Sequence, residues 1–293
     1  MRLADASSLP AAATVERALT TAAAALAAAG IETARVDAEW LLADVLGVTR
    51  GRLGVEPGRA LTTSEAARYA DALRRRERRE PLQHIVGTQA FRDLTVRVGA
   101  AAMVPRPETE ILVEWALAWL PRTPPLVIDV GTGTGCIACA IASERADARV
   151  VALDVSPAAA GLARANVTAL GLAARVTVVE SDLLSALGTG RADLIVANPP
   201  YLPTAVIATL APEVSRFDPR LALDGGPDGL DVVRRLVADA PVRLGAGGAL
   251  LLETAGGEQA RAVVALLRTA GFGGVQTRPD LAGVERFVAG RTR

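Results

Sequence analysis

The segment Asn198-Pro199-Pro200-Tyr201 places an amide side chain and an aromatic ring on either side of two prolines. It follows the apolar run 194–196, yet two prolines cannot extend a strand, because each lacks an amide donor and fixes its own φ. The chain must therefore stop here as a stiff, extended corner that displays an amide side chain and an aromatic ring. Such a corner is either a plain turn or a binding site, and the other strand ends decide between the two.

Residues that suit a cofactor also follow the three apolar runs that precede this one. After "LVIDV" (126–130) comes Gly131-Thr132-Gly133-Thr134-Gly135, whose glycines allow close approach of the backbone to a ligand. Its G-x-G-x-G spacing differs from the G-x-G-x-x-G of dinucleotide folds. Asp154 ends "RVVALD" and could accept hydrogen bonds from a ribose diol, or cap the helix that starts near Ser156.

After the third run, "RVTVVE", stand Asp182 and Leu183, which could bind an exocyclic amine and cover a purine. Ligands of parallel α/β sheets bind beyond the carboxyl ends of the strands. The ordered set of glycines, acid, acid and "NPPY" is similar to the S-adenosylmethionine-dependent methyltransferases, in which "NPPY" marks enzymes that methylate planar amino nitrogens. The resemblance implies S-adenosyl-L-methionine as cofactor and S-adenosyl-L-homocysteine as product, held by residues 131–135, Asp154, Asp182, Leu183 and Asn198.

The corner suits this chemistry because an amide-like nitrogen is a poor nucleophile. The Asn198 side-chain oxygen and the Pro199 carbonyl can accept both N–H bonds of an NH₂ group, which makes the lone pair available. Tyr201 offers a flat face to a flat substrate, and Pro200 stiffens the corner. Holding reactants in line is worth about 7–11 kcal/mol, so a strong base is not required. We predict Asn198, Pro199 and Tyr201 as catalytic residues and 198–201 as the substrate contact.

Four segments narrow the resemblance: "VPRPETE" (104–110), "DVGTGTGCIA" (129–138), "ANPPY" (197–201) and "PRLALDGGPDGLD" (219–231). They resemble the peptide chain release factor glutamine methyltransferases, from about residue 81 to residue 286. This implies that the substrate is the glutamine of the Gly-Gly-Gln loop in class-1 peptide chain release factors and the product N5-methylglutamine. Arg106, Pro107 and Glu108 are then expected to wall the site, or else to form a domain-bridging turn.

The elements that must position these residues fall into two patterns. Residues 14–80 favour helices, with Gly30 and Gly47 at left-handed helix ends, and Thr62 starts the third with a capping box. The apolar face of the second helix is predicted to hold Val36, Trp40, Leu41, Val45 and Leu46. Residues 89–99 alternate as a strand or hairpin, and 108–120 favour a helix.

From residue 126 short apolar strands alternate with helices, which predicts a mostly parallel sheet covered on both faces. The last two strand candidates, 274–280 and 285–290, suggest an antiparallel hairpin. We expect an α/β class I methyltransferase, Rossmann-like, with an antiparallel terminal strand and a small N-terminal helical domain. The predicted divisions are 1–81 for helical substrate recognition, 82–105 for a β-hairpin linker and 106–293 for the S-adenosylmethionine-dependent methyltransferase domain.

The composition excludes several other classes. The 32 basic residues, all arginine, balance 32 acidic ones, which excludes a lysine Schiff base or P-loop lysine and argues against a nucleic-acid coat protein. Cys136 and Cys139 form a CxxC, which is typical of thioredoxins but lies in the apolar "CIACAIA" and is interpreted as helix packing. One histidine and no other cysteine predict no metal site. We expect a cytoplasmic monomer with class-1 release factors as partners and no membrane contact.

Two other functions stay open at this point. A nucleic-acid adenine-N6 or guanine-N2 methyltransferase would offer a basic surface to phosphates, whereas this chain is neutral and its "RRRERRE" (74–80) is interpreted as a salt-bridged helix face. We therefore expect no direct nucleic-acid substrate. An adaptor without cofactor would leave the glycine loop and Asp154 unexplained. His84, at the predicted domain junction, is interpreted as structural rather than as a general base.

Overall fold

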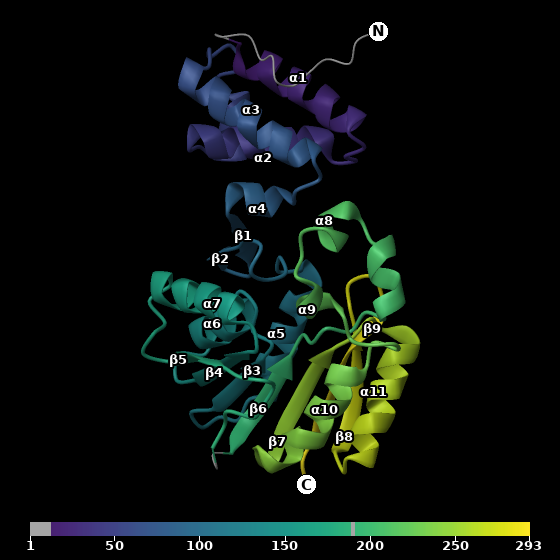
Figure 1. Cartoon of the computed structure of the whole chain (residues 1–293). Coiled ribbons are helices and arrows are strands. Elements are labelled where there is room, and N and C mark those ends of the chain that lie inside the picture. The colour runs from purple at the N-terminus through teal and green to yellow at the C-terminus, as the bar shows by residue number, and fades with distance from the viewer. Residues whose placement is uncertain (1–12, 189–190) are drawn as a thin grey trace. The chain divides into compact units, whose positions relative to one another are not determined.

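The computed structural model describes residues 13–188 and 191–293, which form two compact units (Figure 1). Among the described residues, the first unit comprises 13–87 together with Ala211–Phe217, and the second holds 88–188, 191–210 and Asp218–Arg293. The division at 81/82 and 105/106 stays a prediction, and its residues 1–12 lie outside the described part. A division along the chain alone could not have included 211–217 in the first unit.

The first unit is a helical bundle with its own apolar core. Its elements are α1 (Val15–Ala28), α2 (Ala34–Leu46), the 3₁₀ turn η2 (Arg50–Gly54), α3 (Thr63–Glu77), α4 (Leu82–Val86) and α8 (Pro212–Ser215). The predicted capping box is present, because the Thr62 hydroxyl accepts from the Glu65 amide and the Glu65 carboxylate accepts from the Thr62 amide. Gly47 ends α2 at φ +65°, as predicted.

The buried face of α2 differs from the prediction. Val36 and Trp40 are exposed, and the Arg50 guanidinium lies over the Trp40 ring at 5.5 Å. Small residues such as Ala38 lie in the core instead, because a short side chain lets α2 approach α1 and α3 closely. Of the predicted positions, Leu41 and Val45 are buried.

An ion network crosses this bundle and also corrects the interpretation of residues 74–80. Arg75 pairs with Glu80 at the surface, as a salt-bridged helix face should. Arg76, however, is buried, and its guanidinium lies 2.7 Å from the Asp37 carboxylate on α2 and 2.9 Å from Glu213 on α8. Burial alone would raise the pKa of Glu213, but hydrogen bonds from Arg79 and Arg76 outweigh burial and lower this pKa to about 2. This network ties the segment 211–217 to α3.

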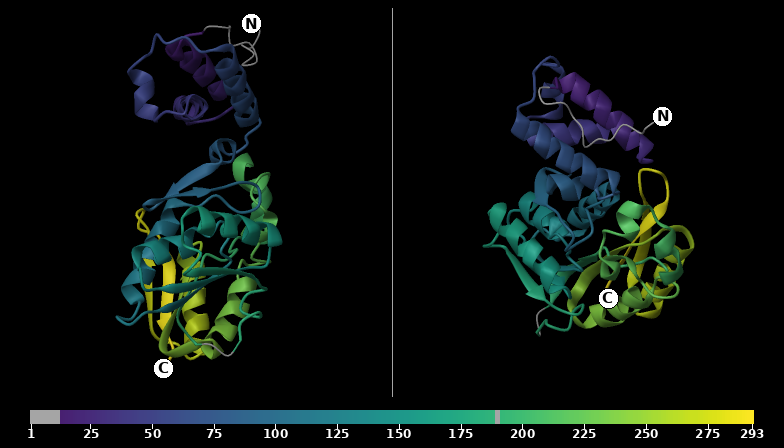
Figure 2. Two further views of the ribbon diagram at one scale, coloured as in Figure 1. Left: turned by 90° about the vertical axis from the view of Figure 1, so that its left-hand side faces the viewer. Right: turned by 45° about the horizontal axis from the view of Figure 1, so that its top comes forward.

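The second unit is built on a sheet that has seven strands in the described part of the chain, in the order β5-β4-β3-β6-β7-β9-β8 (Figures 1 and 2). The strands are β3 (Leu126–Val130), β4 (Arg149–Asp154), β5 (Val176–Glu180), β6 (Ala192–Ala197), β7 (Leu244–Glu253), β8 (Gly273–Pro279) and β9 (Glu285–Arg291). All neighbouring pairs from β5 to β7 are parallel, and β9 runs antiparallel to both β7 and β8. The predicted fold class and the antiparallel terminal strand are confirmed.

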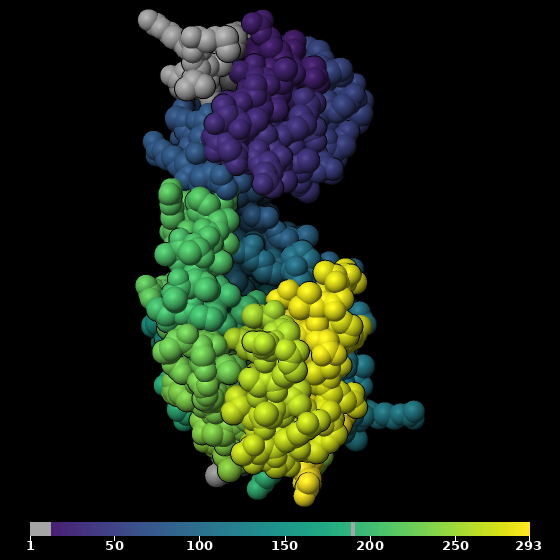
Figure 3. Space-filling view, turned by 90° about the vertical axis from the view of Figure 1, so that its right-hand side faces the viewer, coloured from purple at the N-terminus to yellow at the C-terminus, as the bar shows by residue number. Residues whose placement is uncertain are grey.

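Helices cover both faces of this sheet, as the continuous apolar strands require. On one face lie α5 (Pro107–Trp119), α6 (Cys136–Glu144) and α7 (Pro157–Ala169), and on the other α10 (Asp231–Asp239) and α11 (Gly257–Thr269). Figure 3 shows α11 and the last strands, in yellow tones, as one continuous side of this unit. The shorter elements are η3 (Thr204–Thr209), α9 (Arg220–Leu223) and η4 (Ala240–Val242).

The predicted hairpin forms from β1 (Thr88–Phe91) and β2 (Leu94–Arg97), which pair in an antiparallel two-stranded sheet. Asn166 of α7 holds it, since its side chain accepts from the Arg97 amide at 2.8 Å and donates to the Arg97 carbonyl and to the Thr134 carbonyl. The hairpin is thereby fixed to the glycine loop after β3. None of the helices in 13–188 and 191–293 combines the length and apolar character that a membrane span requires.

The buried Asp37–Arg76 pair is expected to stabilise the helical unit. Asp37→Ala should lower the free energy of unfolding by about 3 kcal/mol, the low end for a broken buried pair, because Glu213 still neutralises Arg76. The matched control is Asp71→Ala, an exposed partner of Arg74 that should leave stability nearly unchanged. Urea unfolding of the whole chain measures both, and equal losses in the two variants would contradict the prediction.

Candidate functional site

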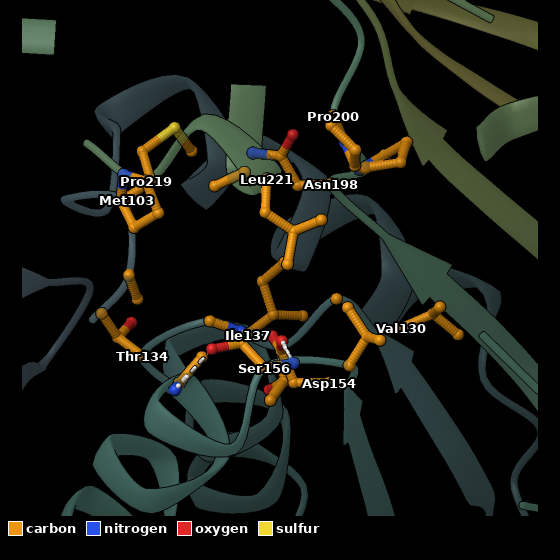
Figure 4. A pocket seen from close by; sticks show the side chains of 18 of the residues that line it. Met103, Val130, Thr134, Ile137, Asp154, Ser156, Asn198, Pro200, Pro219 and Leu221 are labelled. Atoms are coloured by element: carbon orange, nitrogen blue, oxygen red, sulfur yellow. Dashed lines mark hydrogen bonds between the residues drawn. The ribbon is translucent and has the colours of Figure 1, made fainter. Parts of the chain in front are cut away.

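A cavity of about 480 Å³ lies at the carboxyl ends of β3, β4, β5 and β6, where the strand order reverses between β3 and β6. The predicted residues that line it are Gly131, Thr132, Gly133, Thr134, Asp154, Asp182, Leu183, Asn198, Pro199, Pro200 and Arg106. Figure 4 shows Asp154 and Ser156 at one end of the cavity and Asn198 and Pro200 at the other. Ile137 and Leu221 project into the space between these ends (Figure 4).

Asp129, the fourth residue of β3, holds the glycine loop through hydrogen bonds. One oxygen of this fully buried carboxylate accepts from the Thr132 hydroxyl at 2.6 Å and from the Ala138 amide at 3.2 Å. Burial raises the pKa of Asp129 to about 7, although these two hydrogen bonds favour its ionised form. Gly135, the residue of the predicted 131–135 loop that does not line the cavity, occupies the N-cap position of α6 at φ +80° and lies against Ala163 of α7.

Asp154 is both a loop anchor and a cavity wall. Its two oxygens accept from the Gly133 amide at 2.8 Å and from the Ser156 amide at 2.9 Å. The alternative role as helix cap is wrong, because the Ser156 hydroxyl caps α7 by accepting from the Ala159 amide. Each carboxylate oxygen can accept more than one hydrogen bond, so Asp154 retains acceptor capacity toward a diol in the cavity.

Asp182 and Leu183 form a turn after β5 at the cavity wall. The exposed Asp182 carboxylate pairs with Arg235 of α10 at 2.7 Å. Leu183 adopts a left-handed backbone at φ +49°, which costs a residue with a side chain about 1–2 kcal/mol. The Ser181 hydroxyl offsets part of this cost by donating to the Leu183 carbonyl at 2.7 Å. The strained turn leaves an apolar side chain beside the cavity.

The corner after β6 begins where strand pairing stops, at Ala197. The Asn198 side chain donates through Nδ2 to the Thr109 hydroxyl at 3.1 Å, which leaves its carbonyl oxygen available as an acceptor. Tyr201 does not line the cavity. Its half-buried hydroxyl donates to the Glu253 carboxylate at 3.4 Å, and burial followed by the charge of Glu253 raises the pKa of Tyr201.

Two residues that contact this corner, Thr109 and Glu253, were missed by the sequence analysis, and Thr109 also lines the cavity. Thr109 of α5 donates to Glu253 at 2.8 Å, and Glu253 is the last residue of β7 with 1% exposure. Burial raises the pKa of Glu253 to about 7. The sequence does carry a signal for Glu253, because this acid ends an apolar strand as Asp154 does.

The segment before α5 contributes one side of the cavity. The Arg106 guanidinium lines it and pairs with the buried Asp218 carboxylate at 3.0 Å. Burial raises the pKa of Asp218, and the charge of Arg106 opposes that shift. Pro107 and Glu108 are exposed in the first turn of α5 and do not line the cavity. Of the three, Arg106 alone contacts this space.

Neither the cysteines nor His84 belong to the cavity chemistry. Cys136 and Cys139 are buried in α6, where burial raises the pKa of both thiols to about 12, so the packing interpretation is confirmed. Cys136 borders the cavity as part of its wall. His84 lies in α4 of the helical unit. Within the described ranges, no three His, Cys, Asp or Glu side chains are grouped so as to hold a metal ion.

Comparison with known proteins identifies the domains of this chain. Residues 17–87 match the PrmC N-terminal domain family, and residues 109–211 match the methyltransferase small domain family. Release factor glutamine methyltransferase of Deinococcus radiodurans is 47% identical over 93% of this chain and 96% of the relative. The protein of the same name from Geobacter sulfurreducens is 44% identical over 91% of this chain and 92% of the relative.

Solved structures share the fold at much lower identity. The hMettl16 catalytic domain in complex with MAT2A 3'UTR hairpin 6 has a TM-score of 0.59 at 17% identity, over 72% of this chain and 80% of that one. The T. thermophilus 16S rRNA N2 G1207 methyltransferase, solved with AdoMet and guanosine, has a TM-score of 0.50 at 21% identity, over 70% and 50%. At such identities the likeness extends to the fold alone, a methyltransferase fold.

The backbone conformation and the space around Gly135 in the loop and Gly161 in α7 predict opposite effects of Gly→Ala substitution at these two positions. At Gly135 a Cβ would lie 3.2 Å from the Ala163 Cβ at φ +80°, so Gly135→Ala should lower stability by at least about 1–2 kcal/mol. The control, Gly161→Ala, lies in the middle of α7 with open space around it and should raise stability by about 0.5–1 kcal/mol. Thermal unfolding measures both, and a stable Gly135→Ala would show that the loop is not constrained as described.

Proposed function

The chain belongs to the release factor glutamine methyltransferase family, and we propose that it methylates the glutamine side-chain amide in the Gly-Gly-Gln loop of class-1 peptide chain release factors. The product is N5-methylglutamine. The observation that carries this proposal is the orientation of Asn198 at the cavity. Its NH₂ group donates to Thr109, so its carbonyl oxygen is the atom left for the N–H groups of a substrate amide.

The cavity residues fit S-adenosyl-L-methionine as the methyl donor. Asp154 suits a ribose diol because its carboxylate faces the cavity with acceptor capacity left over. The wall formed by 131–134 lets a ligand approach the backbone, and Asp182 and Leu183 suit a purine edge and face. When bound, this cofactor supplies an electrophilic methyl group on a sulfonium and leaves as S-adenosyl-L-homocysteine.

The protein's own contribution is to position the amide and to make its nitrogen nucleophilic. Asn198 Oδ1 and the Pro199 carbonyl accept the two N–H bonds, because strand pairing ends before both residues. These acceptors raise the electron density on the nitrogen and stabilise the positive charge that develops there. Pro200 lines the same wall, while Tyr201 supports the corner through Glu253. The proton on the methylated nitrogen is acidic and is lost to water.

The helical unit is proposed to recognise the protein substrate, because a single amide in a narrow cavity offers little binding area to a whole release factor. Its own core and its match to the N-terminal family domain support this role. We further propose a monomer in the cytoplasm, where translation termination takes place. The nucleic-acid alternative shares the NPPY corner and the fold, but the balanced charge of 32 basic and 32 acidic residues gives it no support.

Asp154 provides a test of the cofactor site. Asp154→Ala should weaken S-adenosyl-L-methionine binding by the equivalent of about 1.5–3 kcal/mol for each charge-assisted hydrogen bond lost. Asp182→Ala should weaken it less, because Asp182 is exposed and already paired with Arg235. Isothermal titration calorimetry measures both affinities. An unchanged affinity of a folded Asp154→Ala protein would remove the ribose contact from the proposal.

Asn198 provides the test of the reaction. Asn198→Ala keeps the prolines and the ring, so transfer of a tritiated methyl group to an intact class-1 release factor should lose about 10²–10³ in kcat. Cofactor affinity should change far less, because Asn198 contacts the reacting amide. A parallel assay offers duplex DNA and RNA to the wild-type protein. Label in nucleic acid instead of the factor, or normal turnover by Asn198→Ala, would refute the proposal.

A further inference from the structure

Three side chains from separate elements form one hydrogen-bonded line that ends at the cavity. The Glu253 carboxylate at the end of β7 accepts from the Thr109 hydroxyl, with Oε2 and Oγ1 2.8 Å apart. That hydroxyl accepts in turn from Asn198, with Nδ2 and Oγ1 3.1 Å apart. Thr109 is 2% exposed and Glu253 1% exposed, so water does not compete for these bonds. The line joins β7, the first turn of α5 and the corner after β6.

The direction of each bond follows from the chemistry of the groups. An ionised carboxylate only accepts, and a hydroxyl has a single proton to donate. Because the Thr109 hydroxyl donates its hydrogen bond to Glu253, it can only accept a hydrogen bond from Asn198. Asn198 must therefore turn its NH₂ group toward Thr109 and its carbonyl oxygen away from it. The polarity of the whole line is set by the charge on Glu253.

Burial of Glu253 disfavours the ionised form of its carboxylate, and the neighbouring groups offset this only in part. Besides Thr109, the groups that face it are Tyr201, whose hydroxyl lies 3.4 Å away, Glu108 of α5, and Arg286 of β9, which also pairs with Asp280. Burial raises the pKa of Glu253, while the hydrogen bond from Thr109 and the charge of Arg286 act in the opposite direction. A buried acid that packing does not need is expected to serve the site that it contacts.

We propose, on the basis of the function proposed above, that Glu253 and Thr109 are positioning residues that hold the Asn198 amide in the one orientation able to accept from the substrate NH₂. A flipped Asn198 would present its own NH₂ group to the NH₂ group of the glutamine. Two donors would then face each other, and the substrate nitrogen would lose an acceptor that makes its lone pair available. The orientation of Asn198 therefore affects turnover rather than cofactor binding.

Protonation of Glu253 allows the donors and acceptors along this line of hydrogen bonds to exchange roles. A protonated carboxyl can donate to Thr109, whose hydroxyl is then free to donate to Asn198 Oδ1, and the flipped amide becomes equally well bonded. The competent form is the ionised one, so activity is present above the pKa of about 7 and declines as the pH falls through it. Arg286 stays charged across this range and does not produce such a limb.

Thr109→Val and Thr109→Ser separate the hydrogen bond from the packing. Valine keeps the branched shape but removes the hydroxyl, so kcat on an intact class-1 release factor should fall about 10-fold to 100-fold, the equivalent of one buried hydrogen bond. Serine keeps the hydroxyl and should restore most of kcat. The dissociation constant for S-adenosyl-L-methionine, measured by calorimetry, should be the same in both variants and the wild type. Normal kcat in a folded Thr109→Val protein would overturn the proposal.

The pH profile tests Glu253 independently, even if Thr109→Val fails to fold. Wild-type kcat should show an acid limb that Glu253→Gln lacks, because a glutamine cannot titrate yet can still accept from Thr109 through its oxygen. An identical acid limb in both proteins would overturn the proposal. If the wild-type protein leaves the release factor unmethylated, the proposed function fails. If it methylates the factor and these variants behave as wild type, the positioning role alone fails.

Discussion

The register of the parallel strands is the constraint on which the site depends. Val130 of β3 pairs with Ala197 of β6, and Ala197 pairs with Leu252 of β7. The next residues along these strands are therefore the first glycine of the loop, the asparagine of the corner and Glu253, side by side at one edge of the sheet. Because a slip by one residue would turn each side chain to the opposite face, the apolar packing of the strands also aligns the chemistry.

The site needs no strong acid or base, because its polar groups are held in position at the carboxyl ends of the strands. Asp129 fixes the glycine loop through the Thr132 hydroxyl and Asp154 fixes it through the Gly133 amide, while Glu253 and Thr109 fix a side chain. In each case a carboxylate at or near a strand end accepts hydrogen bonds from the part that contacts the cavity. Burial makes these carboxylates costly, which the chain offsets with short hydrogen bonds. The result is a preorganised polar surface, the kind of catalyst that an unreactive amide nitrogen requires.

The sequence predicted the sheet and much of the cavity wall, because buried parallel strands are continuous apolar runs whose ends are easy to locate. It could not give the partner of Asn198, since Thr109 is an ordinary first-turn residue until α5 is placed beside β6 and β7. It misassigned Val36 and Trp40, because hydrophobicity alone does not show that a helix packed closely on its neighbours buries alanine in preference to tryptophan. The pairing of Arg76 with Glu213, distant in the chain, depends on the fold and has no local signal.

If the carboxyl ends of these strands methylate a glutamine amide nitrogen, the position of the transferred methyl group in the substrate reveals it. The wild-type protein is incubated with S-adenosyl-L-methionine that carries a deuterated methyl group and with an intact class-1 release factor, and the digest is sequenced by tandem mass spectrometry. We expect one labelled methyl group on the side-chain nitrogen of the glutamine in Gly-Gly-Gln. A label on any other residue, or a factor that stays unlabelled while the protein binds the cofactor, would contradict it.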